Sequence, residues 1–320
     1  MKILVTGAAG FIGFHLSLRL LEMGYKVYGI DNLNDYYDKD LKIARLSILD
    51  SHKAFSFKNI DISIFKDLET FVSSIKPEKI VHLAAQAGVR FSITDPQNYV
   101  YSNLVGHSNI LEISRKFSTQ HLIYASSSSV YGDSSSTPYK ETEIYLNPES
   151  FYAATKLSCE ILTQSYTNLY GILSTGLRFF TVYGPWGRPD MAYYSFTKKI
   201  INNDHIQIYG NGESLRDFTY IDDITEGILR LLEIDTEGRK IHEIYNIGKS
   251  NPISVNHLVK SLEDLLQKKA TIEYVQEQKG DVKQTFADVS KLADKIGYFP
   301  RVELEEGLTY FVDWYKEYHH

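Results

Sequence analysis

The chain has 320 residues, 43% of them hydrophobic, which is enough to bury a full core in one large or two modest domains. Its formal net charge of -6 argues against a general affinity for nucleic acid or an anionic membrane surface. The single cysteine, Cys159, excludes a disulfide framework and a cysteine-rich zinc site, as is typical of the reducing cytosol. No segment approaches the ~20 apolar residues that span a bilayer, and no signal peptide pattern precedes the first strand. We therefore expect a cytoplasmic protein without a metal site.

Short β-branched runs alternate with amphipathic helical stretches through the first half of the chain. The predicted strands are Lys2–Thr6, Lys26–Ile30, Phe55–Asn59, Lys79–Leu83, His121–Ala125 and Leu173–Phe179. The predicted helices are Phe11–Met23, Ile64–Ile75, Tyr99–Lys116 and Phe151–Leu169, the last ended by Gly171. This order predicts an α/β fold, a doubly wound parallel sheet of the Rossmann type.

The composition changes after Phe180. A stretch rich in Gly, Pro and Trp (Tyr183–Pro189) is followed by a helix-like segment (Tyr193–Asn202) and a Gly-Asn-Gly turn. We expect a smaller C-terminal α/β domain that binds the substrate and that the chain enters more than once. The predicted division assigns residues 1–180 plus about 217–248 to the Rossmann domain, and about 181–216 plus 249–320 to the second domain.

Three glycines, Gly7, Gly10 and Gly13, follow the first predicted strand and open the first helix. Glycine allows the backbone to approach a pyrophosphate closely, and a helix N-terminus supplies free N–H groups and a partial positive charge. The spacing G-x-x-G-x-x-G differs from the G-x-G-x-x-G of the standard fingerprint and is typical of short-chain dehydrogenases. The loop therefore predicts a dinucleotide site.

Asp31 ends the second predicted strand, where a carboxylate can accept hydrogen bonds from the adenosine ribose and repel a 2′-phosphate. NAD is therefore favoured over NADP. Residues after the third and fourth predicted strands would contact the adenine and the rest of the cofactor, because these strands end at the same edge of the sheet. The residues predicted to bind NAD are Gly7, Gly10, Phe11, Ile12, Gly13, Asp31, Asn32, Asp61, Ile62, Leu83, Ala84, Ala85, Tyr152 and Lys156.

Tyr152 and Lys156 lie four residues apart on a predicted helix and therefore share a face. The spacing alone proves little, because tyrosine and lysine repeat it elsewhere in the chain. Tyr152 differs because its helix follows a serine run, Ser126–Ser129, at the carboxyl end of the fifth strand, where open α/β sheets bind ligands.

Hydride transfer from a sugar carbon to nicotinamide requires removal of the hydroxyl proton at the same carbon. A phenol with an ordinary pKa of ~10 is a poor base at neutral pH, but a neighbouring ammonium favours the phenolate. A serine hydroxyl nearby can relay the proton. We therefore predict Tyr152 as base and acid, Lys156 as its electrostatic partner and ribose ligand, and Ser127 as the relay.

Five motifs make the chain resemble the extended short-chain dehydrogenases (NAD-dependent epimerases and dehydratases) over essentially its full length. They are T-G-A-A-G-F-I-G, H-L-A-A-Q, S-S-x-V-Y-G, Y-x-x-x-K and R-D-F-T-Y-I-D-D. The resemblance implies an enzyme that oxidises and re-reduces one carbon of a nucleotide-activated sugar.

A narrower stretch, R-F-F-T-V-Y-G-P-W-G-R-P-D-M-A from Arg178 to Ala192, resembles the UDP-glucuronate 4-epimerases. By matching position, the resemblance implies that Thr181 and Arg188 contact the hexuronate carboxylate. Arg216 would contact the UDP diphosphate. The residues predicted to bind the substrate are Ser127, Ser128, Thr181, Arg188, Arg216 and Gln278. Gln278 stands near the place where UDP-galactose 4-epimerases carry a second phosphate-binding arginine, which weakens a neutral-sugar assignment.

The resemblance thus implies conversion of UDP-glucuronate to UDP-galacturonate through a 4-keto intermediate, with transient hydride transfer to NAD. It also implies a homodimer through the helices predicted at 99–116 and 151–169. Three alternatives stay open: a decarboxylase that forms UDP-xylose, a 4-epimerase of UDP-glucose or UDP-N-acetylglucosamine, and a protein that senses NAD without turnover. Dehydratases of the family place Asp and Glu after the relay residue, whereas this chain has Ser128 and Ser129.

Overall fold

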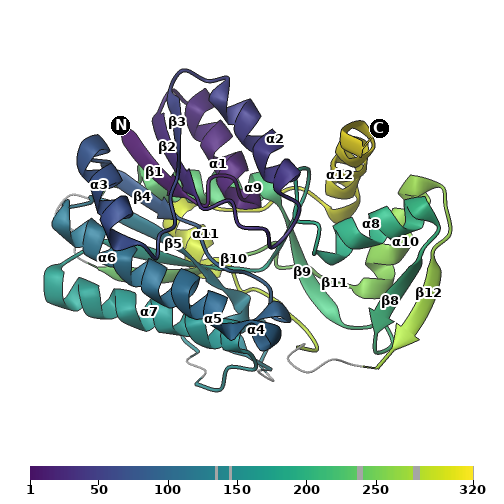
Figure 1. The fold of residues 1–320 in the computed structure, drawn as a ribbon. Coiled ribbons are helices and arrows are strands. Elements are labelled where there is room, and N and C mark those ends of the chain that lie inside the picture. Colours follow the sequence, from purple (N-terminus) through teal and green to yellow (C-terminus); the bar gives the residue numbers. More distant parts are fainter. Residues whose placement is uncertain (134–135, 144–145, 236–240, 277–281, 320) are drawn as a thin grey trace.

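The larger part of the molecule is built on a seven-stranded parallel sheet with strand order β10-β6-β5-β4-β1-β2-β3 (Figure 1). The structure is a computed structural model and describes residues 1–133, 136–143, 146–235, 241–276 and 282–319. The strands are β1 (Lys2–Thr6), β2 (Lys26–Asp31), β3 (Phe55–Asn59), β4 (Lys79–His82), β5 (His121–Ser127), β6 (Ser174–Phe179) and β10 (His242–Ile247). The direction of strand succession reverses between β1 and β4, which confirms the predicted doubly wound α/β fold.

Helices cover both faces of this sheet. On one face lie α1 (Phe11–Glu22), α2 (Lys39–Asp50) and α9 (Ile221–Glu233), and on the other lie α3 (Phe65–Ile75), α6 (Gly106–Lys116) and α7 (Phe151–Tyr170) (Figure 1). Each layer buries its own apolar cluster against the sheet. Because both faces are covered, the inner strands β1, β2, β4, β5 and β6 are almost wholly buried, whereas the edge strands β3 and β10 are partly exposed.

A second group of elements, formed mainly by the second half of the chain, contains two small sheets and three helices. It lies at the right of Figure 1. A three-stranded sheet contains β7 (Thr181–Tyr183), β9 (Leu215–Tyr220) and β11 (Pro252–Ser254), and a parallel pair contains β8 (His205–Tyr209) and β12 (Thr271–Val275). The helices here are α8 (Ala192–Asn202), α10 (Val255–Leu266) and α12 (Leu304–His319), whereas α11 (Ser290–Ile296) packs on β10 and α9.

The structure differs from the predicted helices in two places: one predicted helix is interrupted, and one observed helix was not predicted. The helix predicted over Tyr99–Lys116 is interrupted: short helices α4 (Phe91–Thr94) and α5 (Pro96–Tyr99) lead into a π-helical turn, η1 (Val100–Val105), before α6 begins. A π turn inserts a residue into the 3.6-residue repeat without breaking the apolar pattern, so periodicity does not detect it. Helix α2 was not predicted, because charged residues, Lys42 and Arg45, occupy positions on its buried face.

Candidate functional site

A cavity of about 260 Å³ extends across the carboxyl ends of the central strands. Every residue predicted to bind NAD lines it, together with Ser127 and Arg188. The other lining residues are Asn34, Tyr36, Tyr37, Lys42, Ile60, Gln86, Ala87, Ser102, Ala125, Ser126, Phe179, Phe180, Val182 and Met191. The residues predicted for cofactor binding and for proton transfer are thus brought together.

The glycine loop between β1 and α1 requires residues without a Cβ. Gly7 has φ +72°, and a Cβ there would lie 2.8 Å from the backbone N of Ala84. A Cβ on Gly13 would lie 2.0 Å from the carbonyl oxygen of Gly7. Helix α1 begins at Phe11 without a side-chain cap for its first N–H groups, and its first residues line the cavity. This cradle fits a dinucleotide pyrophosphate.

The carboxylate of Asp31 sits at the end of β2 beside this loop. It accepts a hydrogen bond from the backbone N–H of Leu33 at 2.8 Å. Burial raises the pKa of the Asp31 carboxyl, and the nearby Lys42 ammonium opposes that shift. The Nζ of Lys42 is itself held by the backbone and side-chain oxygens of Asn34, at 2.9 and 2.8 Å. An acceptor placed here suits the hydroxyls of an adenosine ribose.

The three residues predicted for proton transfer come from two neighbouring elements. Ser150 caps α7 by accepting from the N–H of Ala153, so Tyr152 stands in the first turn of the helix. One turn later, Lys156 donates from Nζ to the carbonyl oxygen of Ala125 at 2.8 Å, and this Nζ lies 6.0 Å from the ring centroid of Tyr152. Ser127 ends β5, and its Oγ accepts from the N–H of Ser129 at 3.2 Å.

Asn103 in the π turn was missed by the sequence reasoning. Its side chain donates to the carbonyl oxygen of Gln86 at 3.1 Å and to Oγ1 of Thr155 at 3.0 Å, and it accepts from the N–H of Gln86 at 2.8 Å. It thereby joins the loop after β4, which lines the cavity, to the helix that carries Tyr152. The sequence does not predict that Asn103 points inward. The extra residue of the π turn turns the side chain inward, and the hydrophobic periodicity does not reveal a π turn.

Arg188 lines the cavity but already has an acidic partner. Its Nε donates to Oδ1 of Asp190 at 3.0 Å and its Nη2 donates to Oδ2 at 2.6 Å. The hydroxyl of Tyr36 donates to the same carboxylate at 3.2 Å. Burial opposes ionisation of Asp190, but the charge and hydrogen bonds of Arg188 lower its pKa. A substrate carboxylate would therefore have to share this guanidinium with Asp190.

Three other predicted substrate residues lie outside the cavity lining. Ser128 opens the 3-10 turn η2 (Ser128–Tyr131), Thr181 begins β7, and Arg216 lies in β9, where its Nη1 donates to the carbonyl oxygen of Leu215. Gln278 lies outside the described residues. The assignment of these four residues to the substrate stays a prediction.

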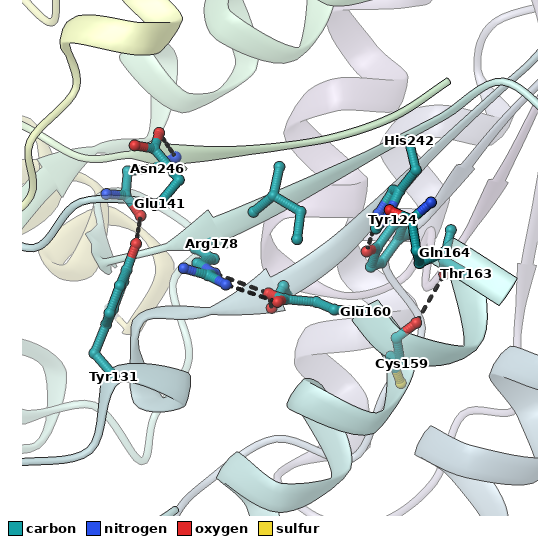
Figure 2. A network of polar contacts seen from close by, with 12 residues as sticks. Tyr124, Tyr131, Glu141, Cys159, Glu160, Thr163, Gln164, Arg178, His242 and Asn246 are labelled. Carbon is teal, nitrogen blue, oxygen red and sulfur yellow. Dashed lines mark hydrogen bonds and ion pairs between the residues drawn. The ribbon is translucent and has the colours of Figure 1, made fainter. Parts of the chain in front are cut away.

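A buried ion pair ties the site to the sheet behind it (Figure 2). Arg178 of β6 donates to both oxygens of Glu160 on α7, at 2.9 and 2.8 Å, and Oγ of Ser126 donates to Glu160 at 2.5 Å. The guanidinium of Arg178 also lies 4.7 Å from the ring centroid of Tyr131. Glu160 stands one turn after Lys156, so the ion pair holds α7 against β6, and the Ser126 bond holds it against the end of β5.

Within the described ranges, no group of three His, Cys, Asp or Glu side chains is arranged to hold a metal ion. None of the helices in these described ranges has the length and apolar character needed to cross a membrane.

The chain is similar to several known proteins over its full length. A family model described as GDP-mannose 4,6 dehydratase matches residues 4–311. Protein CapI of Staphylococcus aureus is 45% identical over 100% of this chain and 99% of its own length, and UDP-glucuronate 4-epimerase 1 of Arabidopsis thaliana is 44% identical over 100% of this chain and 77% of its own. The crystal structure of UDP-glucuronic acid 4-epimerase from Bacillus cereus with UDP-glucuronic acid and NAD has a TM-score of 0.93 and 38% identity, and the match covers 99% of this chain and 100% of that one. The chain therefore belongs to the family of this model, within the extended short-chain dehydrogenases.

Proposed function

We propose that this protein is an NAD-dependent isomerase that interconverts UDP-glucuronate and UDP-galacturonate by 4-epimerisation. The observation that carries the proposal is that the glycine loop, the Tyr152–Lys156 pair and Arg188 line one cavity. Hydride-transfer chemistry and a group that binds carboxylates therefore share one site. A homologue that is 38% identical binds UDP-glucuronic acid and NAD together, which supports the same pair of ligands here.

NAD held by the glycine loop and Asp31 would supply the acceptor and donor of the hydride at C4 of the sugar. In the proposed reaction, Tyr152 removes the C4 hydroxyl proton as the hydride leaves and gives it back when the hydride returns. Lys156, held by the carbonyl oxygen of Ala125, stabilises the phenolate, and Ser127 orients the shared proton. The keto sugar rotates about its bond to the diphosphate and accepts the hydride on its other face. No net oxidation results, so NAD can stay bound.

The family model is described as a dehydratase, but we do not propose dehydration for this chain. Elimination of water from a keto sugar needs an acid and a base next to the relay residue. Ser128 and Ser129 follow Ser127, and their hydroxyls cannot replace a carboxyl pair at neutral pH. We therefore propose epimerisation and not dehydration.

Arg188 would protect the intermediate from decarboxylation. The 4-keto hexuronate is a β-keto acid, which loses carbon dioxide when the breaking bond aligns with the π system of the ketone. A guanidinium that it shares with Asp190 can still hold the carboxylate by a charged hydrogen bond and so prevent this alignment. Thr181 is proposed to assist from β7.

The variant Arg188→Ala is expected to lower kcat/KM for UDP-glucuronate by about 10- to 100-fold, the cost of a lost charged hydrogen bond. Carbon dioxide released per turnover should rise, because the carboxylate is no longer restrained. Radiolabelled carbon dioxide and nucleotide-sugar NMR measure the two effects. Arg19→Ala, an exposed arginine of α1 paired with Glu22, serves as control. If Arg188→Ala changed neither quantity, the assigned role would be wrong.

The proposed function is tested by incubating the purified protein with UDP-glucuronate, without added NAD, and following nucleotide sugars by NMR. The expected result is a mixture with UDP-galacturonate, formed by NAD that co-purifies. UDP-xylose as the product would identify a decarboxylase instead. If no reaction occurred even with added NAD, neutral UDP-sugars would be tried next, and inactivity with these would favour an NAD-sensing protein.

We also propose that the protein is a cytoplasmic homodimer that supplies polysaccharide synthesis. Large apolar side chains are exposed on η1 and on α7, two elements that contact each other. They are Tyr101, Val105, Ile161 and Leu169. A second copy could bury this surface in a four-helix contact.

The two-domain division predicted from the sequence is proposed with the same boundaries, residues 1–180 plus about 217–248 and about 181–216 plus 249–320. Its support is that β10 joins the large sheet, whereas α8, α10, β8 and β12 pack together elsewhere. Helix α11, which this division places in the second domain, packs on β10 and α9 of the Rossmann domain.

A further inference from the structure

Arg45 on α2 is a fully buried arginine, with 0% of its surface exposed. Its guanidinium partners in the described residues are neutral oxygens, and its Nε has no hydrogen-bond acceptor. Burial of a charge is costly unless hydrogen bonds replace the lost water, and an apolar side chain would fill the same space more cheaply. Filling the space therefore does not explain why this position is an arginine, whereas the geometry of its hydrogen bonds does.

Those bonds connect two segments of the site. Nη1 donates to the carbonyl oxygen of Ala9 in the glycine loop and to the hydroxyl of Tyr37, both at 2.8 Å. Nη2 donates to the carbonyl oxygens of Trp186 and Gly187, at 2.5 and 3.1 Å. Because a guanidinium is planar and holds its donors in a fixed fork, it sets the separation of the segments it joins.

The segment on the far side, residues 184–190, is here called the substrate loop. Its backbone is unusual: Trp186 has φ 58°, and a Cβ on Gly187 would lie 1.8 Å from the hydroxyl of Tyr193. Residues hold such conformations only when their surroundings enforce them. Arg45 binds the carbonyl oxygens of these two residues, which immediately precede Arg188.

Other contacts hold the loop at its start. His15 of α1 bonds to the carbonyl oxygen of Pro185 at 2.9 Å, and the Trp186 ring packs on Phe14 and Trp314. None of these contacts involves the peptide between Gly187 and Arg188. The orientation of that peptide determines the direction in which the Arg188 side chain leaves the backbone. Arg45 fixes this orientation, because it donates to the carbonyl oxygen of Gly187.

We propose that Arg45 is a positioning residue that sets the substrate loop against the glycine loop and thereby orients Arg188 for the uronate carboxylate. This inference rests on the proposed function for the role of Arg188. Arg45 itself does not line the cavity, so it acts through the loop and not on the ligand. Specificity for a charged sugar would then depend on a residue that touches neither cofactor nor substrate.

The test compares two ligands, because a general loss of structure would weaken both. Calorimetry on the NAD-loaded protein gives the Kd of UDP-glucuronate and of UDP, which lacks the uronate. Arg45→Lys keeps the charge and loses the fork. It is expected to weaken UDP-glucuronate binding about tenfold and to leave UDP binding within about twofold. The matched control, Arg19→Lys on the exposed face of α1, should change neither Kd.

A double-mutant cycle shows whether Arg45 acts through Arg188. In an Arg188→Ala background, Arg45→Lys should leave the ratio of the two affinities unchanged, because the group it positions is gone. The proposal would be overturned if Arg45→Lys left the ratio of the two affinities unchanged, whether or not both affinities fell. It would also be overturned if Arg45→Lys lowered this ratio as much in the Arg188→Ala background as in the wild type.

If Arg45→Lys does not fold, Tyr37→Phe carries the test, since it removes one of the two acceptors of Nη1. A smaller fall in the affinity ratio, about twofold, is then expected, and an unchanged ratio overturns the proposal. Failure of the proposed function is distinguishable, because it appears in the wild-type protein as absence of conversion of UDP-glucuronate.

Discussion

Replacement of Tyr152 by phenylalanine is expected to lower turnover of UDP-glucuronate by about 10²- to 10⁴-fold, the usual contribution of a positioned acid-base group. The change removes one oxygen and keeps the ring, which packs edge-on against Tyr99 with centroids 6.1 Å apart. Binding of UDP-glucuronate and NAD should therefore persist. Initial rates by NMR and ligand affinities by calorimetry measure both effects.

The matched control is Tyr166→Phe on the same helix, since Tyr166 packs against Tyr170 and does not line the cavity. Its turnover should equal that of the wild type. Near-normal turnover in Tyr152→Phe would assign the proton transfer to another group. Loss of both binding and turnover would indicate a structural role for Tyr152.

Removal of one partner of the buried ion pair is expected to have the largest effect on stability. Arg178→Met leaves the Glu160 carboxylate, whose side chain is 5% exposed, without its guanidinium. Breaking such a pair costs about 3–5 kcal/mol of unfolding free energy, because an uncompensated charge stays buried. Urea unfolding in the absence of added ligand measures the loss, since a ligand that binds only the folded state would mask it.

Two further variants separate charge from packing. The double variant Arg178→Met with Glu160→Leu should recover part of the loss, because apolar residues can replace a buried pair. Arg115→Met removes an exposed arginine paired with Glu112 and should unfold near the wild-type urea concentration. If Arg178→Met matched this control, the pair in Figure 2 would not stabilise the fold.

The features that the sequence by itself determined are local in the chain. The alternation of strands and helices follows from hydrophobic periodicity, and its prediction of the α/β fold is confirmed. Gly13 is required by the carbonyl oxygen of Gly7 in the same loop, so the spacing of the glycines identifies the loop. Tyr152 and Lys156 share a face because one helix carries both.

The features that only the tertiary structure decided join segments far apart in the chain. Arg45 bonds to residues about 140 positions later, and its helix was missed because the residues on its buried face are partly charged. Asn103 acts through a π turn, which periodicity cannot register. Asp190 sits two residues from Arg188, but only the folded loop pairs them. Hydrophobic patterns specify which face is buried, whereas the partner of a buried polar group depends on how the elements pack, and that information is not local.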